Sequence, residues 1–238
     1  MTPPLSLALI RRFDLFAQAP DETLQALLLH AQVRRLAAGE ALFQQAETAT
    51  HFFLLLGGTL KVVKTTPQGE QVVVRFVRPG DLLGIARLLN RPDYPATASA
   101  IEDSLALAWP CGAWERMLAL HPRLAGQALQ TVGQRLQGAH TRIEELATEE
   151  VEQRVAHTLL RLVAQSGQPQ EDGRIAIGFP ITRQDIAEMT GTTLHTVSRL
   201  LSAWQERGIV ENGRKRVAVR DQAALQRLAS GAERRQPQ

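Results

Sequence analysis

Short apolar runs separated by glycines fill the chain from about residue 33 to residue 107. Three of these runs have the length of a strand: FFLLL at 52–56, LKVVK at 60–64 and VVVRFV at 72–77. Strands at this spacing are typical of an antiparallel sandwich or barrel. A helical pattern at 20–31 precedes them, and a short apolar stretch at 82–89 interrupts them. We therefore expect an N-terminal helix or arm over 1–18 and a β-roll sensor domain over 19–111.

The pattern becomes helical over 112–147, first in a short piece and then in a long run that Pro122 opens. The apolar residues of the long run are spaced by three, four, seven and three, as Leu129, Val132, Leu136, Ile143 and Leu146. At about 1.5 Å per residue this run spans roughly 40 Å, which is more than one small domain needs. The stripe therefore predicts a dimerisation helix from 122 that meets a second copy of itself. Burial within a single chain is the alternative, since Gly133 and Gly138 weaken the helix but permit close approach.

Residues 182–199 have the pattern of two short helices joined by a glycine turn. Thr182 is placed to cap the first helix, and Asp185 can return a bond to the cap's own amide. Gly191 supplies the positive φ at which one helix stops, and Thr193 can cap the next. The second helix then leaves Leu194, His195, Thr196, Ser198 and Arg199 pointing outward. In a helix-turn-helix such residues enter the major groove of DNA, whereas an αα-hairpin packed in a core is the alternative.

A basic hairpin is predicted directly after the second helix. A strand at 209–210 leads to AsnGly at 212–213, a strong signal for a tight turn, and Val217 and Val219 alternate on the return strand. Residues 181–220 hold seven cations, Arg183, Arg199, Arg207, Arg214, Lys215, Arg216 and Arg220, against Asp185, Glu188, Glu206 and Glu211. Because binding to nucleic acid requires phosphate neutralisation, this hairpin indicates a wing. We expect a winged helix-turn-helix over 148–232 and a disordered tail over 233–238.

Composition narrows the classes of protein that fit. With 238 residues, of which 44% are apolar, the chain can fill the cores of two ordinary domains. No apolar run approaches the roughly 20 residues of a membrane span and no signal peptide opens the chain, so we expect a cytoplasmic protein without a membrane partner. A net charge of only +3 means that nucleic-acid affinity must come from local charge. The single cysteine, Cys111, excludes an intrachain disulfide and a cysteine-ligated iron–sulfur cluster, and no catalytic or metal-ligand motif occurs, so neither an enzyme nor a metal site is expected.

The order of β-roll, long helix and winged helix-turn-helix resembles the cyclic AMP receptor protein/FNR (Crp/Fnr) superfamily of transcription regulators, from about Leu15 to Ala229. The specific motifs are PGDLLG at 79–84, the helix-turn-helix, and RLQGAHTRIEEL at 135–146, which falls without a gap on the family's dimer helix. The resemblance implies an α+β fold with a cyclic-nucleotide-binding-like β-roll (jelly roll). It also implies a homodimeric activator that binds a palindromic operator in double-stranded DNA and recruits RNA polymerase. Two helix-turn-helix domains joined by one coiled coil would fit two DNA half-sites that lie about one helical turn apart.

The resemblance also implies the residues that contact DNA: Thr182, Arg183, Thr193, His195, Thr196, Ser198, Arg199, Arg214 and Lys215. Family members use the matching Ser–Arg pair to read bases, so Arg199 is expected to donate to guanine while Thr182, Arg183 and the wing position the phosphates. His195 stands where most relatives carry a glutamate that accepts from a cytosine amino group. Since an imidazole can donate instead, we expect a guanine or thymine acceptor at that step.

The sensor half departs from the family's cyclic-nucleotide-binding pattern. Those members hold the ribose with a glutamate just after the glycine of the 79–84 turn, and they hold the phosphate with an Arg–Ser pair. This chain has Ile85 at the glutamate position and Tyr94 and Pro95 at the Arg–Ser positions. A cyclic nucleotide would bring an unpaired phosphate into an apolar pocket at a cost of roughly several kcal/mol, so cyclic AMP is not expected. The cysteine cluster of the iron–sulfur branch is absent. By elimination, and from PATA at 95–98, the chain looks most like the nitric-oxide-responsive and denitrification regulators, some of which use haem.

We expect a pocket for an effector other than cyclic AMP, formed by Gly84, Ile85, Leu88, Tyr94, Thr97, Leu136 and His140. His140 fills the gap in the apolar stripe between Leu136 and Ile143. It is interpreted either as a polar spacer that fixes helix register or as an effector contact, such as an axial haem ligand. Two other functions stay open: a dimer that binds DNA without any effector, and a β-roll module that acts on protein partners, against which the basic hairpin argues.

Overall fold

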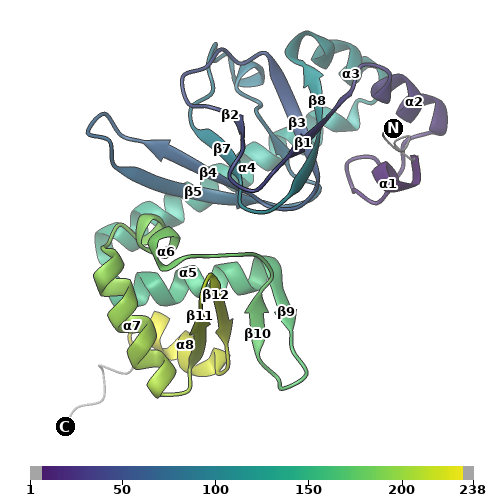
Figure 1. The fold of residues 1–238 in the computed structure, drawn as a ribbon. Coiled ribbons are helices and arrows are strands. Elements are labelled where there is room, and N and C mark those ends of the chain that lie inside the picture. The colour runs from purple at the N-terminus through teal and green to yellow at the C-terminus, as the bar shows by residue number, and fades with distance from the viewer. Residues whose placement is uncertain (1–6, 233–238) are drawn as a thin grey trace. The chain divides into compact units, whose positions relative to one another are not determined.

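The computed structural model describes residues 7–232 (Figure 1). The first six residues of the expected N-terminal arm and the expected disordered tail at 233–238 lie outside the described residues. The described chain forms two compact units, one with residues up to 70 and 74–137 and the other with 71–73 and the residues from 138 onward. The division falls inside helix α4 (Arg123–Thr148), not at its end, and the domain limits expected from the sequence stay predictions.

The first unit is built on two four-stranded sheets, with strand orders β1-β8-β3-β6 and β2-β7-β4-β5. The strands are β1 Gln32–Leu36, β2 Ala41–Phe43, β3 His51–Gly57, β4 Leu60–Thr65, β5 Gln71–Val77, β6 Leu82–Leu83, β7 Thr97–Ala100 and β8 Ser104–Pro110. Strand β8 pairs antiparallel with β1 and β3, and β7 pairs antiparallel with β2 and β4. This is the antiparallel β-roll that the spacing of apolar runs predicts.

Strand β3 shows why its apolar run is continuous instead of alternating. Phe53 and Leu55 lie in a core between the two sheets, whereas Phe52 and Leu54 lie in a second core on the other face. The second core is covered by α1 (Leu7–Arg11), α2 (Asp21–Leu28), α3 (Trp114–Leu120) and the start of α4. Because side chains alternate between faces, a strand buried on both faces has no polar positions. Short 3₁₀ helices at Arg87–Leu89 and Cys111–Ala113 complete the unit.

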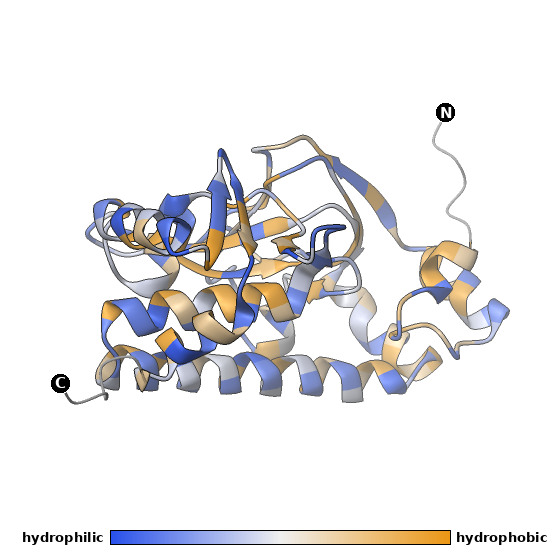
Figure 2. Ribbon diagram, turned by 90° about the horizontal axis from the view of Figure 1, so that it is seen from below, coloured by the Kyte–Doolittle hydropathy of each residue, from blue (hydrophilic) through white to orange (hydrophobic). Residues whose placement is uncertain are grey.

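The second unit holds four helices and a small sheet of order β11-β12-β10-β9. Its elements after α4 are α5 Val151–Ser166, β9 Gly167–Pro169, β10 Ile175–Ile177, α6 Arg183–Thr190, α7 Leu194–Glu206, β11 Val210–Gly213, β12 Arg216–Val219 and α8 Gln222–Ala229. Helix α5 contacts α6 and α8, and its face carrying Val155, Leu159 and Leu162 is buried. Figure 2 shows hydrophobic and hydrophilic residues on both the strands and the helices. Among residues 7–232, no helix combines the length and apolar character of a membrane span.

Candidate nucleic-acid interface

Helix α6 begins at a reciprocal cap, as the sequence predicts. The hydroxyl of Thr182 accepts a hydrogen bond from the Asp185 amide at 3.0 Å, and the Asp185 carboxylate accepts from the Thr182 amide at 2.9 Å. The Thr182 hydroxyl also lies 2.6 Å from that carboxylate. Both polar groups of Thr182 are therefore engaged within the cap, where they hold α6 in place.

The turn between α6 and α7 is fixed by Gly191, which has φ +61°. Thr193 then caps α7 by accepting from the Thr196 amide at 3.2 Å. On the inner face of α7, Val197, Leu201 and Trp204 are buried. These features confirm the two capped helices and the glycine turn expected from the sequence, because each depends on residues within one helical turn of the others.

The outward face of α7 presents polar and charged side chains. His195 and Arg199 are exposed, as is Thr193, whereas Thr196 and Ser198 are half-buried. Leu194, at the first position of the helix, is 48% exposed. The sequence places Leu194 on this outward face, but it is absent from the residues inferred to contact DNA, since the family resemblance points to its polar neighbours. The structure thus places on one short helix all five residues that the sequence predicts to face outward, Leu194, His195, Thr196, Ser198 and Arg199.

The wing has its turn two residues later than the sequence predicts. Strands β11 and β12 pair Gly213 with Arg216, so Arg214 and Lys215 form the turn, and Lys215 has φ +56°. The expected turn at Asn212–Gly213 is wrong because Asn212 is held inside strand β11.

Three neighbours hold the Asn212 side chain. Its amide donates to the side chain of Gln205 and to the Leu201 carbonyl, and its oxygen accepts from the Arg183 guanidinium. These contacts tie the wing to α6 and to the end of α7. They also engage Arg183, one of the residues predicted to contact phosphate.

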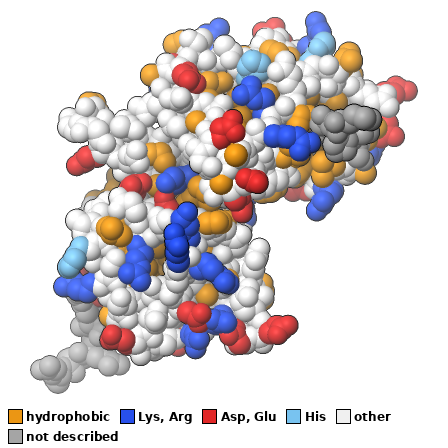
Figure 3. Space-filling model, viewed as in Figure 1, with side chains coloured by type: hydrophobic (Ala, Val, Ile, Leu, Met, Phe, Trp, Pro, Cys, Tyr) orange, Lys and Arg blue, Asp and Glu red, His pale blue; other side chains and the backbone are white. Residues whose placement is uncertain are grey.

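Ion pairs divide the cations of the wing into two groups. Glu211 pairs with Arg174 and, at 2.7 Å, with Arg220. Hydrogen bonds from Arg220 and then Arg174 lower the pKa of Glu211, so this carboxylate stays charged and offsets the Arg220 charge counted in the sequence. The cations at the tip, Arg214, Lys215 and Arg216, are exposed. Figure 3 shows Lys and Arg side chains gathered over α6, α7 and the β11–β12 hairpin.

The residues predicted to form the effector pocket occupy different surroundings. Gly84 has φ +70° and packs against Phe53, and Ile85 is buried in the core beneath the helices. Tyr94 belongs to the core between the sheets, where its ring stacks on Phe43 with centroids 4.1 Å apart. Its hydroxyl donates to the His51 carbonyl at 2.7 Å and accepts from the His51 amide at 3.1 Å. Burial raises the pKa of Tyr94.

Thr97, Leu136 and His140, three further members of the predicted pocket, are less enclosed. The hydroxyl of Thr97 accepts from the Gln45 amide at 3.0 Å. Leu136 is 56% exposed and His140 is exposed, while Leu88 lies in the 3₁₀ helix at Arg87–Leu89. Within the first unit, Ile85, Tyr94 and Thr97 thus have separate surroundings, and the role of the whole set in effector binding stays a prediction.

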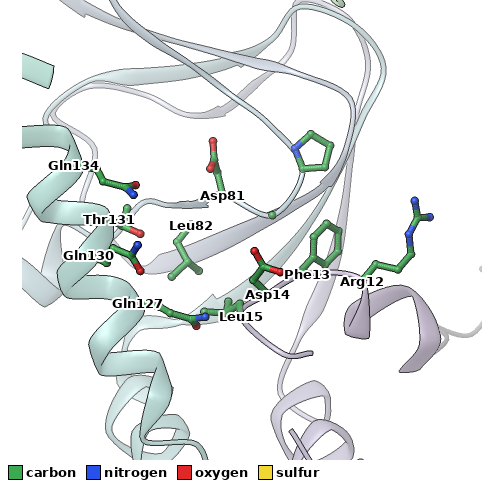
Figure 4. A pocket seen from close by; sticks show the side chains of 12 residues that line it. Arg12, Phe13, Asp14, Leu15, Asp81, Leu82, Gln127, Gln130, Thr131 and Gln134 are labelled. Carbon is green, nitrogen blue, oxygen red and sulfur yellow. The ribbon is translucent and has the colours of Figure 1, made fainter. Parts of the chain in front are cut away.

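A cavity of about 330 Å³ lies elsewhere in the first unit, between the chain at 12–15, the turn at 79–82 and the face of α4 (Figure 4). Its lining includes Asp14, Asp81, Leu82, Gln127, Gln130 and Gln134, and none of the residues predicted for the effector pocket. The cavity is polar in character, and the sequence offers no spacing from which this meeting of three segments follows.

Two half-buried guanidinium groups were also missed by sequence reasoning. Arg135 of α4 donates to the Leu82 carbonyl, and Arg75 of β5 lies 3.7 Å from Asp81. Burial, assisted by the charge of Arg75, lowers the pKa of Arg135 to about 10, and Asp81 opposes this shift. Sixty residues separate the two arginines along the chain, so only the fold brings their charges to the same turn.

Comparisons with known proteins agree with this geometry. Residues 33–121 match the model of the cyclic nucleotide-binding domain, and residues 153–228 match that of the Crp-like helix-turn-helix domain. The Cyclic AMP receptor protein of Thermus thermophilus is 30% identical over 213 residues, which cover 90% of this chain and 94% of that protein. The Global nitrogen regulator of Synechococcus elongatus is 30% identical over 199 residues, or 83% of this chain and 89% of that protein.

A solved structure, that of FixK2 from Bradyrhizobium japonicum, has the same fold. Its TM-score is 0.71 at 24% identity, with 83% of this chain and 96% of that chain covered. The cyclic nucleotide-binding match lies before the helix-turn-helix match along the chain, and the chain belongs to the Crp/Fnr family of DNA-binding transcription regulators.

Proposed function

We propose that this chain is a homodimer that reads a palindromic operator through α7 and is gated by an effector other than cyclic AMP. The observation that carries the DNA-binding part is the outward face of α7, where His195 and Arg199 are exposed in the same unit as the exposed wing cations. A capped helix with free polar side chains beside a basic hairpin is what major-groove reading with phosphate contacts requires.

The proposed dimer rests on the apolar stripe of α4. Its large side chains are uncovered in the single chain: Leu129 is 73% exposed, Leu136 56%, Ile143 62% and Leu146 55%. Leu129, Leu136 and Ile143 follow one another at seven-residue intervals, the repeat of a coiled-coil seam. A second copy would remove this stripe from water. Sedimentation should give a dimer for the natural chain and a monomer for Leu136→Glu, with Glu144→Lys on an exposed position of the same helix as the control.

The DNA contacts are tested by comparing arginines in different settings. Arg199→Ala should cost about 1–3 kcal/mol on the selected operator and relax specificity at one base pair. Arg214→Ala should weaken all sequences alike and reduce the dependence of affinity on salt. Arg220→Ala is the matched control, because Arg220 is paired with Glu211. Equal losses on operator and random DNA for Arg199→Ala and Arg214→Ala would contradict the assignment of roles.

The proposed effector is not a cyclic nucleotide, although several relatives, among them the Cyclic AMP receptor protein of Thermus thermophilus, are named for cyclic AMP. Ile85 stands at the ribose position and is buried among apolar side chains, and Tyr94, at the phosphate position, spends its hydroxyl on the His51 backbone. Neither residue offers a cation to a phosphate. Calorimetry with cyclic AMP should therefore show no binding, and micromolar affinity would overturn this part of the proposal.

Haem is the effector probe that the likeness to nitric-oxide-responsive regulators favours. His140 is exposed on α4, and it is the residue of the predicted pocket that would supply an axial nitrogen to a haem. Titration with haem should give a Soret band that moves in His140→Ala if His140 is a ligand. If the chain binds neither haem nor cyclic AMP, the alternative proposal holds, which is a dimer that binds DNA without an effector. Recruitment of RNA polymerase is tested by transcription from a promoter that carries the selected operator.

A further inference from the structure

Arg154 of α5 bonds to the ends of two other helices. Its Nε donates to the carbonyl of Thr190, the last residue of α6, at 3.1 Å. Its Nη1 donates to the carbonyl of Glu149, directly after α4, at 2.7 Å. The last carbonyls of a helix have no partner within that helix and carry its negative partial charge. One guanidinium therefore satisfies two helix ends, and all of these residues belong to the second unit.

The position of Arg154 within α5 does not by itself favour an arginine. It is the fourth residue of the helix, close to the end at which negative side chains are preferred. Its side chain is half-buried. A guanidinium holds five N–H donors in a planar fork and can bond to acceptors in two directions, whereas a lysine ammonium is a single point of charge. The two helix ends therefore explain why this position holds an arginine.

Side chains of α5 also hold the end of α4, so the acceptor of Arg154 has a fixed place. The carboxylate of Glu149 lies 3.0 Å from His157 Nδ1. Glu145, which is only 8% exposed, pairs with Arg161. Both His157 and Arg161 belong to α5. The last turn of α4 is therefore attached to the helix that carries Arg154.

A second contact joins the end of α4 to the turn between α6 and α7. A Cβ added at Gly191 would lie 3.2 Å from the end of the Leu146 side chain, so this leucine lies against the turn. Leu146 comes two residues before the end of α4, and the turn leads directly to Thr193, which caps α7. Two separate contacts thus connect the end of α4 with the place where α7 begins.

The proposed function, on which this inference rests, gives these contacts a consequence. It assigns dimer formation to α4 and DNA reading to α7, and the spacing of the half-sites that a dimer binds is set by the placement of its two reading helices. Freedom between the end of α4 and the start of α7 would become freedom in that spacing. We infer that Arg154 is a positioning residue for operator recognition: through Thr190 and Glu149 it restricts the spacing between half-sites that the dimer accepts.

Operators that differ only in the length of their spacer test this inference. An operator is first selected from random DNA with the full-length protein, and one base pair is then added or removed between its half-sites. For the natural chain each change should lower affinity about tenfold or more, as a mismatched base pair does, because it moves one half-site by about 3.4 Å. In Arg154→Met this penalty should shrink by at least about threefold, the factor that corresponds to one hydrogen bond. Fluorescence anisotropy measures the affinities.

Base preference at a fixed spacing is the readout that a general loss of stability does not imitate. A single mismatch within a half-site should cost Arg154→Met as much as it costs the natural chain, because the reading face of α7 is unchanged. Arg154→Lys keeps the charge without the fork and should also relax the spacing. Arg227→Met and Arg227→Lys, at an exposed position of α8, are the matched controls and should keep the natural preference. Hydrogen exchange and sedimentation report the fold and association of each variant.

The outcomes separate this inference from the proposed function. Equal losses at every spacing, or loss of the fold or of the dimer in both Arg154 variants, would assign Arg154 to stability alone and overturn the inference. A changed base preference at the natural spacing would overturn it as well, and DNA binding by the natural chain would stand in each of these cases. If the natural chain enriches no DNA sequence, or binds its half-sites equally well at every spacing, the proposed dimeric reader fails, and the inference with it.

Discussion

Substitution of alanine for two glycines should change stability in opposite directions. Gly191, at the turn between α6 and α7, has φ +61°, whereas Gly138 lies within α4, where an added Cβ would meet no atom within 4 Å. An alanine at a left-handed position costs about 1–2 kcal/mol. Alanine also lowers the conformational entropy of the unfolded chain relative to glycine, which stabilises the folded state by about 0.4–1 kcal/mol. Gly191→Ala should therefore destabilise the α6–α7 pair by about 1 kcal/mol net.

Substitution of alanine for Gly138, inside α4, should instead increase stability. In a helix interior alanine is favoured over glycine by about 0.5–1 kcal/mol, and nothing in the described chain obstructs the added methyl group of Gly138→Ala. Native-state hydrogen exchange of the amides of α6, α7 and α4 measures both effects locally. A global unfolding transition would not separate them, because the chain has two units. The exchange free energy of α6 and α7 should fall in Gly191→Ala, and that of α4 should rise in Gly138→Ala.

A third variant distinguishes backbone strain from crowding at Gly191. The added Cβ would lie 3.2 Å from the end of the Leu146 side chain, which is flexible enough to yield. Gly191→Asn introduces the same Cβ, but asparagine tolerates the left-handed region. Gly191→Asn should therefore lose less than half as much stability as Gly191→Ala. If the two variants lose equally, crowding against Leu146 is the cause, and a neutral Gly191→Ala would refute the conformational argument altogether.

Two further predictions concern single side chains. His195→Glu should move the preferred base at one step of the half-site from guanine or thymine to cytosine, because a carboxylate accepts where an imidazole donates; selection from random DNA measures this, and an unchanged half-site would contradict it. Tyr94→Phe should cost about 1–3 kcal/mol in thermal or urea unfolding, since it removes both bonds to the His51 backbone. Because burial raises the pKa of Tyr94, its contribution is fully present below about pH 10 and is lost as pH rises through the folded-state pKa, so the natural chain should lose more stability at alkaline pH than Tyr94→Phe does. Parallel pH curves for the two chains would refute the role of Tyr94.

The reading helices could be predicted from the sequence because their determinants are local. Thr182 and Asp185 are three residues apart, and Gly191 and Thr193 set the turn within one segment, so caps and positive φ follow from residue type and spacing. The α4 stripe could be predicted for the same reason, since helical periodicity fixes which side chains share a face. The β-roll could be predicted from strand-length apolar runs between glycines. Which strands pair with one another could not be predicted from these runs.

Contacts between distant segments were decided only by the tertiary structure. Asn212 looks like a turn residue in the sequence, but bonds to α6 and α7 hold it in a strand and move the turn to Arg214 and Lys215. Arg220 is one of the basic residues of the wing in the sequence, but in the fold its charge is paired with that of Glu211. Tyr94 is buried where the two sheets pack, in surroundings that its neighbours in the sequence do not reveal. For Asn212 the local turn preference is worth about a kcal/mol or less, and long-range hydrogen bonds of similar or greater strength override it.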